Sequence, residues 1–465
     1  SLNNNMNNPI LDADSYKFSH FNQYPPDTKG TFFYLESRGG IYDETVFFGL
    51  NYIIHRYLNQ PITMEMVEEA KTIIEAHGEP FDYIGWKYIA GWHKGYLPLH
   101  IRAVQEGSII PTHNVLMTVE STDLHVFWLP GWIETQLVRL WYPITVATIS
   151  YHCKKLLRKY WLETSDSDST GVSYQLHDFG ARGVSSQESA GIGGLANLVN
   201  FRGSDTVQAI VFAQKYYNED VAALSIPAME HSTVTAWGRE SEHLAYENML
   251  SRYSKPNQAF ACVVDSYNDL EAITEIGAML GKNLLLTGGT LVIRLDSGDP
   301  IEVIHKVLPL LHEYFTSFTN SKGFQVFTNI KILWGDGLDP QTIETILAHF
   351  CGLSCYSSEN FVFGMGGGLL QKVHRDTFKF AYKLSAIQNK DGVWRGVNKS
   401  PVNDPGKNSR AGRLDLICND RQYETVESDI GNQSALHTVY YSSISNRTVT
   451  TENLSCIRER IDSSL

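Results

Sequence analysis

The feature that most constrains the fold of this 465-residue chain is one order of elements repeated between residues 260 and 375. Each repeat has a short apolar run, an acidic or glycine-rich turn, and a stretch with the pattern of a helix. The apolar runs are Phe260–Val264, Thr290–Ile293, Lys331–Trp334 and Phe361–Phe363. The helices expected after the first three are 269–280, about 301–315 and 340–350. Buried strands that alternate with helices predict βαβ units and a parallel sheet.

Two earlier runs, Tyr174–Gly180 and Ala223–Pro227, are interpreted as further strands of the same series. The flanking regions instead mix short strand-like and helix-like stretches. The expected strands are Gly30–Glu36 and His100–Val104, and the expected helices are Glu44–Leu58 and Met64–His77. The sequence therefore predicts an α/β fold with an irregular (β/α) barrel core over 145–375. A second, mixed α+β domain is expected from both chain ends, 1–144 and 376–465.

The charge balance excludes several classes of partner. The chain has 38 Lys and Arg against 51 Asp and Glu, a formal net charge of −13. Such an acidic surface disfavours binding to nucleic acid or anionic membranes, which needs many basic contacts. The polar start, Ser1–Asn8, has no secretory signal pattern, and no apolar run is long enough to span a membrane. Six cysteines without a CxxC pair are expected to be reduced thiols, so we expect a cytoplasmic protein.

Two glycine-rich turns follow successive strands and indicate phosphate binding. Gly364–Gly368 lies between an apolar strand and an expected helix, where backbone N–H groups can approach an anion. Gly335–Gly337, one strand earlier, is expected to form the adjacent wall, as in the phosphate sites of barrels. The alternative is a pair of plain tight turns. A set of basic residues follows: Arg375, Lys383, Lys399 and Lys407.

Acidic residues also mark the strand ends, at Asp265, Asp296 and Asp336. Carboxylates there can hold Mg²⁺ through water or stabilise a cationic transition state, but each could simply cap a helix. His231 follows an apolar run and lies beside Glu230. A general base or phosphate-accepting role is plausible for this imidazole, and a structural role is the alternative.

Long blocks of sequence carry a more specific signal than any of these motifs. The blocks are Asp14–Lys17, Trp132–Thr135, Trp141–Thr148, His177–Gly180, Arg182–Glu188, Gly203–Thr206, Glu230–Thr233, Asp265–Tyr267, Asp296–Gly298, Gly335–Gly337 and Gly366–Lys372. In residues and order they resemble the nicotinamide phosphoribosyltransferases, in the barrel-type nicotinate/nicotinamide phosphoribosyltransferase family. The resemblance covers nearly the whole chain and implies a barrel of the type II phosphoribosyltransferase kind.

The resemblance implies a pentosyl transfer: nicotinamide and phosphoribosyl pyrophosphate give nicotinamide mononucleotide and pyrophosphate, with Mg²⁺ and accessory ATP hydrolysis. It also implies a homodimer with active sites shared between subunits. Nicotinamide would be bound by Phe179, Asp205, Arg182 and the partner's Tyr16. The ribose and phosphates would be bound by Gly335, Asp336, Gly366, Gly367, Arg375, Lys383, Lys399 and Lys407. The catalytic residues would be Arg294, Asp296 and His231. ATP would phosphorylate His231, and Asp265 and Asp296 would bind the metal ion, either directly or through water.

The chain departs from the family pattern in two places. Ala381 stands where the family tends to carry a hydroxyl residue, and the stretch Gly39–Tyr42 after Arg38 replaces a longer basic insertion. Both changes remove expected contacts to phosphates. Two alternative functions remain open from the sequence: a nicotinate phosphoribosyltransferase, and a non-catalytic binding or signalling relative. Asp205 argues against the first, because a carboxylate accepts from an amide NH₂ and repels a carboxylate.

Overall fold

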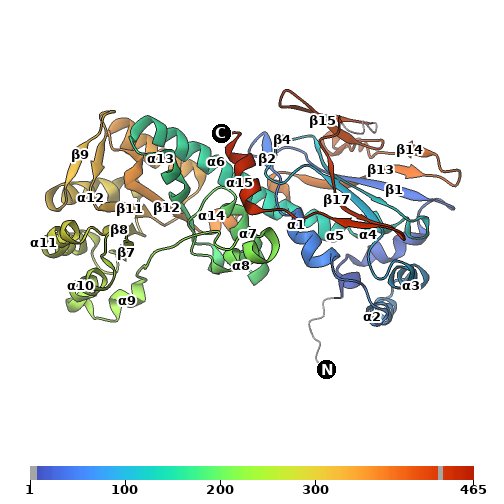
Figure 1. The fold of residues 1–465 in the computed structure, drawn as a ribbon, viewed down its shortest axis with the longest axis horizontal. Helices are drawn as coiled ribbons and strands as arrows, with labels where there is room; N and C mark the ends of the chain where they lie inside the picture. Colours follow the sequence, from blue (N-terminus) through green and yellow to red (C-terminus); the bar gives the residue numbers. More distant parts are fainter. Residues whose placement is uncertain (1–7, 428–432) are drawn as a thin grey trace. The chain divides into compact units, whose positions relative to one another are not determined.

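The computed structural model describes residues 8–427 and 433–465. The chain divides into two compact units (Figure 1). The first comprises Ser1–Thr148, Ala213–Glu219 and His374–Leu465, and the second Ile149–Phe212 and Asp220–Val373. These units differ from the predicted ranges chiefly in residues 213–219, which group with the first unit. Residues 1–7, which carry most of the polar start, lie outside the described residues.

The second unit is built on a parallel sheet in the order β6–β12–β11–β8–β7. Its strands are β6 (Leu176–Asp178), β7 (Ala259–Val263), β8 (Thr290–Leu295), β11 (Ile330–Trp334) and β12 (Phe361–Met365). Single parallel bridges continue the pairing from β7 back to β6, through Ala228–Ala261, Gly203–Leu224 and Asp178–Ser204. The predicted irregular barrel is therefore confirmed. Of the two early runs, Tyr174–Gly180 supplies the short strand β6, whereas Ala223–Pro227 forms no strand and pairs only through an isolated bridge at Leu224.

The barrel strands form because apolar side chains fill both of their faces. In β8, Leu291, Val292, Ile293 and Leu295 are all buried, which is the pattern of a parallel strand covered on both sides. Helices lie around these strands (Figure 1). They are α10 (Glu242–Tyr253), α11 (Asp269–Thr287), α12 (Pro300–Tyr314) and α13 (Pro340–Leu347). Further helices are α6 (Trp141–Thr164), α7 (Gln187–Leu198), α8 (Val207–Tyr217), α9 (His231–Thr235) and α14 (Gly367–Leu370).

The helices that follow β7, β8 and β11 are capped by side chains other than the predicted acids. The caps of α11, α12 and α13 are Asn268, Asp299 and Asp339, each accepting a backbone N–H three residues on. Asp265, Asp296 and Asp336 lie three residues before these caps. The helix-cap alternative is therefore wrong for all three, and their carboxylates remain at the strand ends for other contacts.

The first unit contains a sheet in which every adjacent pair is antiparallel, in the order β14–β13–β1–β5–β3–β17–β18. The strands are β1 (Gly30–Ser37), β3 (Leu99–Ala103), β5 (Val115–Ser121), β13 (Phe380–Gln388), β14 (Trp394–Gly396), β17 (His437–Ser442) and β18 (Arg447–Val449). Helices α2 (Met64–Ala76), α3 (Tyr83–Trp92) and α15 (Leu454–Asp462) belong to the same unit. Both chain ends thus supply this α+β fold.

Three helix predictions are only partly right. Helix α11 extends to Thr287, seven residues beyond the predicted 269–280. The stretch Glu44–Leu58 begins as strand β2 (Glu44–Val46), and α1 (Leu50–Ile53) starts only after Gly49, whose φ of +111° suits glycine. The helix expected over 340–350 ends as α13 at Leu347 and continues as a π-helical turn, Ala348–Leu353. Propensity alone does not resolve such changes of helical type.

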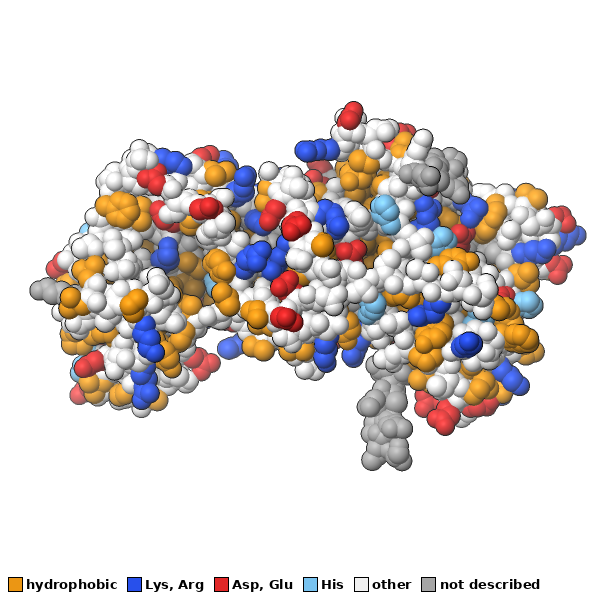
Figure 2. Space-filling view, in the orientation of Figure 1, with side chains coloured by type: hydrophobic (Ala, Val, Ile, Leu, Met, Phe, Trp, Pro, Cys, Tyr) orange, Lys and Arg blue, Asp and Glu red, His pale blue; other side chains and the backbone are white. Residues whose placement is uncertain are grey.

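The surface carries charges of both signs, and the cysteines are unpaired. Acidic and basic side chains are interspersed on the visible face, without a broad basic patch (Figure 2). All six cysteines are free thiols. Within residues 8–427 and 433–465, none of the helices is both long and apolar enough to cross a membrane.

Candidate active site in the barrel

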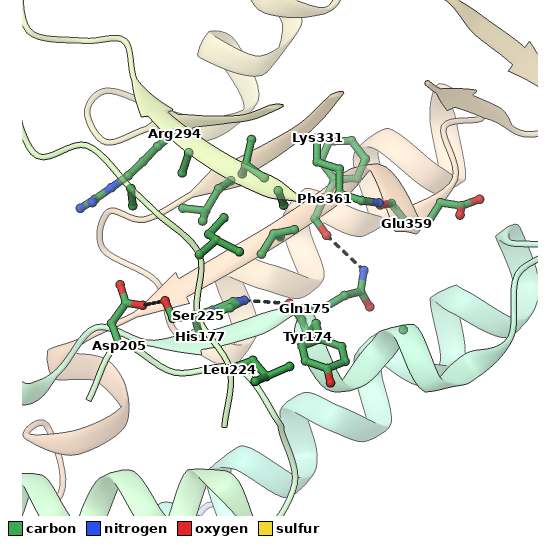
Figure 3. Close-up of a pocket in the computed structure, with 18 of the residues that line it drawn as sticks. Tyr174, Gln175, His177, Asp205, Leu224, Ser225, Arg294, Lys331, Glu359 and Phe361 are labelled. Atoms are coloured by element: carbon green, nitrogen blue, oxygen red, sulfur yellow. Dashed lines mark hydrogen bonds between the residues drawn. The ribbon is translucent and has the colours of Figure 1, made fainter. Parts of the chain in front are cut away.

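A cavity of about 520 Å³ lies inside the barrel of the second unit (Figure 3). Its walls include alternate residues of single strands: Gln175, His177 and Phe179 around β6, Val292 and Arg294 on β8, and Lys331 and Leu333 on β11. Alternation occurs because successive side chains of a strand point to opposite faces. The floor is apolar, with Phe179 packed against buried Ala261, Val292 and Leu333. A small flat ligand with a few polar groups fits such a cavity.

Phe179 is held firmly at the wall of this cavity. Its backbone N–H donates to Met365 O at 2.9 Å, which continues the pairing of β6 with β12. The ring lies directly against Gly364, where an added Cβ would come within 2.0 Å of a ring carbon. The guanidinium carbon of Arg294 lies 5.2 Å from the ring centroid. The ring therefore has one fixed position, next to a cation, from which it can stack on a planar ligand.

Asp205 lies at the same cavity and presents a carboxylate to it (Figure 3). The hydroxyl of Ser225 donates to Asp205 Oδ1 at 2.7 Å, which fixes the orientation of the carboxylate. Each carboxylate oxygen has more than one acceptor site, so a ligand N–H can be accepted as well. Asp205 can therefore recognise a donor group on a ring stacked at Phe179.

Several cavity residues have polar roles that the sequence did not reveal. His177 Nε2 lies 3.0 Å from Tyr174 O, and burial lowers the pKa of this imidazole, so it is neutral near pH 7. Lys331 Nζ donates to Glu359 O at 2.5 Å, and burial lowers the pKa of its ammonium group. The period of two along each strand would have placed both side chains inside once Phe179 and Leu333 were assigned there.

Arg294 and Asp296 form a two-point ion pair at the end of β8. Arg294 Nη2 lies 3.1 Å from Asp296 Oδ2, and Arg294 Nε donates to Asp296 Oδ1 at 3.3 Å. Gly335, after the neighbouring strand β11, makes room for this pair, since an added Cβ would lie 2.8 Å from Asp296 Oδ1. The structure thus brings three predicted site residues together.

A second polar cluster joins His231, Asp265 and Ser297. His231 Nε2 lies 2.7 Å from Asp265 Oδ1, and Ser297 Oγ donates to Asp265 Oδ2 at 2.6 Å. The Asp265 side chain is almost buried, whereas that of His231 is 45% exposed. A buried carboxylate that holds an exposed imidazole in one orientation is the arrangement expected for an imidazole that reacts through its other nitrogen. Nearby, Arg182 Nη2 lies 3.9 Å from Glu230 Oε1, and both side chains are exposed.

The two glycine turns adjoin each other, as predicted. Gly368 approaches the carbonyl of Leu338 so closely that an added Cβ would lie 2.4 Å from its oxygen. The helix expected after the second turn is short, since α14 has only four residues. The turn itself also begins later than predicted, because Gly364 belongs to strand β12. No heavy atom lies within 4 Å of a Cβ built on Gly367. An anion there would meet backbone N–H groups of the turn with little help from a helix dipole. Asp336, in the first turn, is exposed.

The other predicted site residues lie in the first unit. Tyr16 is 57% exposed in a 3₁₀ helix, Ser15–Asn22, with Lys17 Nζ 5.7 Å from its ring centroid. Burial lowers the pKa of Lys383. The negative charge of Glu134 opposes this shift, whereas the neighbouring positive charges of Lys399, Arg38 and Arg375 lower the pKa further. Such mutually repelling cations are stabilised by an anion.

Three further predicted positions lie in the same unit. Lys407 Nζ is 3.9 Å from Asp404 Oδ2, and both side chains are exposed. Ala381 is buried in β13, opposite Glu36 of β1. The short stretch after Arg38 packs tightly, since a Cβ on Gly40 would lie 2.2 Å from Thr377 O.

The residues expected to approach a metal are already paired in this structure. Both oxygens of Asp265 accept hydrogen bonds, and both oxygens of Asp296 face Arg294. Among the described residues, no group of three or more His, Cys, Asp or Glu side chains is gathered as metal ligands would be. A Mg²⁺ ion bound there would therefore have to meet these carboxylates through its own waters.

Comparison with known proteins identifies the family. The model of the nicotinate phosphoribosyltransferase family matches residues 174–442, and the model of the nicotinamide phosphoribosyltransferase N-terminal domain matches residues 8–101. A nicotinamide phosphoribosyltransferase of Xanthomonas campestris is 48% identical over 93% of this chain and 92% of its own length. One from Acinetobacter baylyi is 32% identical over 93% of each chain.

Solved structures share the fold at low sequence identity. A nicotinate-nucleotide pyrophosphorylase from Pyrococcus furiosus has a TM-score of 0.61 at 14% identity and covers 99% of this chain and 96% of its own. Human nicotinic acid phosphoribosyltransferase has a TM-score of 0.55 at 15% identity, with coverage of 97% and 93%. With the family models and the bacterial relatives, these matches show that the chain belongs to the nicotinate phosphoribosyltransferase family, on its nicotinamide phosphoribosyltransferase branch.

Proposed function

We propose that this protein transfers the phosphoribosyl group of phosphoribosyl pyrophosphate to nicotinamide, giving nicotinamide mononucleotide and pyrophosphate in pyridine nucleotide salvage. The observation that carries the proposal is one cavity that holds both an aromatic wall, Phe179, and a carboxylate, Asp205, in a chain 48% identical to a nicotinamide phosphoribosyltransferase. Phe179 would stack on the pyridine ring, and Asp205 would accept a hydrogen bond from the carboxamide.

The proposed reaction needs little acid–base catalysis from the protein. The ring nitrogen of nicotinamide attacks C1′ of the ribose as pyrophosphate leaves, and positive charge develops on the ribose. The site must hold the ring in line with C1′, stabilise that charge and accept the charge of pyrophosphate. We assign the first task to Phe179 and Asp205, and the second to Asp296, which Arg294 orients.

The phosphates need positive charge and N–H groups. We assign the 5′-phosphate to the glycine turns at Gly335–Asp336 and Gly366–Gly367. We assign pyrophosphate to the basic cluster of the first unit, which comprises Arg375, Lys383, Lys399 and Lys407. Mg²⁺, when bound with pyrophosphate, supplies charge neutralisation for the leaving group. Asp265 and Asp296 would hold it through its waters, as their existing hydrogen bonds require.

We further propose that the protein acts in the cytoplasm as a homodimer in which each site uses residues of both subunits. Tyr16 and the basic cluster belong to the first unit, whereas Phe179, Asp205 and the glycine turns belong to the second. Tyr16 is exposed, as expected for an aromatic ring that completes a neighbouring subunit's site. This arrangement would place nicotinamide between Phe179 and Tyr16 of the other subunit.

The proposal predicts a preference for the amide over the acid that depends on Asp205. Asp205→Ser should weaken discrimination against nicotinate by about 1–3 kcal/mol, because one charged hydrogen bond to the amide and one repulsion of the acid are lost. The measurement is kcat/KM for nicotinamide and for nicotinate. Glu359→Gln, which changes an acid elsewhere in the same cavity, is the matched control and should keep the parent ratio. A parent enzyme that prefers nicotinate would refute the proposed function.

Accessory ATP hydrolysis is proposed to proceed through His231. We expect His231→Ala to abolish both the gain in product formation caused by ATP and the accompanying ATP hydrolysis. ATP-independent transfer should remain measurable, because ring positioning and charge stabilisation do not use this imidazole. A tenfold loss of the ATP-stimulated rate corresponds to about 1.4 kcal/mol of barrier. His243→Ala, on the following helix α10, is the control; an equal ATP effect in parent and His231→Ala would remove His231 from the mechanism.

A further inference from the structure

Asp178 is a fully buried acid next to the cavity that does not line it. It is the last residue of β6 and 0% exposed, whereas its neighbours His177 and Phe179 line the cavity. The alternation of a strand therefore directs its side chain outward, toward helix α7. There a Cβ on Gly194 would lie 3.1 Å from Asp178 Oδ2, so this glycine makes room for the carboxylate.

Asp178 joins two segments that carry the residues proposed to bind nicotinamide. Its Oδ1 accepts a hydrogen bond of 2.7 Å from the backbone N–H of Gly180, the residue that follows Phe179 in the chain. Its backbone oxygen accepts the N–H of Asp205 at 3.2 Å. Gly180 O in turn accepts Gly183 N–H at 3.0 Å and so closes the turn that carries Arg182. Hydrogen bonds to this one residue thus hold the backbone next to Phe179 and the backbone of Asp205.

The surroundings of Asp178 shift the pKa of its carboxyl group. Burial raises its pKa to about 6, the hydrogen bond from Gly180 N–H opposes the rise, and the negative charge of Asp205 adds to it. Among the described residues, Asp178 Oδ2 has no hydrogen-bond partner. Helix α7 presents a glycine there, and the remaining ionisable neighbour on β6 is His177. Within the described part of the chain, the one hydrogen bond that this costly buried carboxylate accepts therefore leads to Gly180, next to the ring-bearing residue of the nicotinamide pocket.

We propose that Asp178 is a positioning residue: without touching the substrate, its side chain holds the turn after Phe179, and so sets the ring against Asp205, which the backbone of residue 178 holds in every variant. The inference rests on the proposed function of the cavity and adds a residue to it. Binding sites need their supporting groups fixed to within about 0.5 Å, so loss of this link should weaken nicotinamide far more than phosphoribosyl pyrophosphate.

The experiment compares Asp178→Ala with Asp168→Ala. Asp168, an exposed residue of the same unit, also accepts the N–H two residues on, from Thr170 at 2.9 Å, so its variant controls for the loss of such a hydrogen bond. Asp178→Ala should raise the KM for nicotinamide at least tenfold and change the KM for phosphoribosyl pyrophosphate less than threefold. The control should leave both KM values at the parent level.

Asp178→Asn supplies a readout that a merely structural role would not move. It keeps an oxygen for the Gly180 N–H but cannot titrate. In the parent, nicotinamide binding measured without phosphoribosyl pyrophosphate should weaken as the pH falls through about 6, because the hydrogen bond from Gly180 loses its charged acceptor. In Asp178→Asn this change near pH 6 should disappear. This readout also decides the question if Asp178→Ala does not fold.

Two results would overturn the inference. One is a KM for nicotinamide within twofold of the parent in folded Asp178→Ala. The other is an equal pH response in the parent and in Asp178→Asn. Both presuppose a parent that makes nicotinamide mononucleotide. A parent that fails to do so refutes the proposed function instead, so the two failures are distinguishable.

Discussion

An equal mixture of Phe179→Ala and Tyr16→Ala chains should recover about a quarter of the parent activity, although each variant alone is nearly inactive. Random pairing makes half of the dimers mixed, and each mixed dimer has one of its two sites intact, which gives about one quarter of the sites. Each single variant should lose about 2–4 kcal/mol of transition-state stabilisation, since an aromatic wall contributes both buried area and stacking.

The measurement is nicotinamide mononucleotide formation before and after subunit exchange, with exchange followed independently by tagged chains. Tyr16→Phe, which keeps the ring, should retain most of the activity alone and serves as the matched control. If each site were formed within one chain, the mixture would show no gain, because every chain would carry its own defective residue. Absence of recovery despite complete exchange would therefore exclude the shared site.

The barrel was predictable because its strands obey a strong physical pattern. Runs such as Thr290–Ile293 are apolar on both faces and are followed by a cappable helix, which in a chain of this length has few alternatives to a parallel sheet. The glycine-rich stretch at Gly191–Gly194 resembles a dinucleotide turn in its letters, yet it lies inside helix α7. The letters alone do not identify a dinucleotide turn, because such a turn must directly follow a strand.

The sequence predicts which residues form the site better than it predicts the contacts between their side chains. Asp265 and His231 are 34 residues apart, and only the closing of the barrel sets the imidazole on the carboxylate at 2.7 Å. The sequence around Asp265 also allows a helix cap, but Asn268 takes that role in the folded chain. The roles of Tyr16 and Lys383 rest on the resemblance to the family, since no local pattern distinguishes them from exposed surface residues. Side-chain pairing across strand ends is a property of the folded chain.

Gly364→Ala should disable nicotinamide binding while leaving the fold intact. The added Cβ would lie 2.0, 2.3 and 2.8 Å from three carbons of the Phe179 ring, and contacts under 3.0 Å force a displacement. The ring is the end of a side chain, so it should move into the cavity rather than disrupt β12. Overpacking of this kind costs about 1–3 kcal/mol. Taken from nicotinamide binding, that free energy corresponds to a fall of about five- to 150-fold in kcat/KM for nicotinamide.

Two variants make this prediction specific to the ring. Gly352→Ala adds the same methyl group in the same unit, where no heavy atom lies within 4 Å, and should behave as the parent. Phe179→Leu has a smaller side chain, so Gly364→Ala added to it should cost much less than in the parent, a coupling that a double-mutant cycle measures. Additive losses would mean that Gly364 acts through the backbone of β12. Non-additive losses would instead mean that the aromatic ring requires glycine at this position, because Phe179 can occupy its place beside the cavity only where β12 presents no side chain to it.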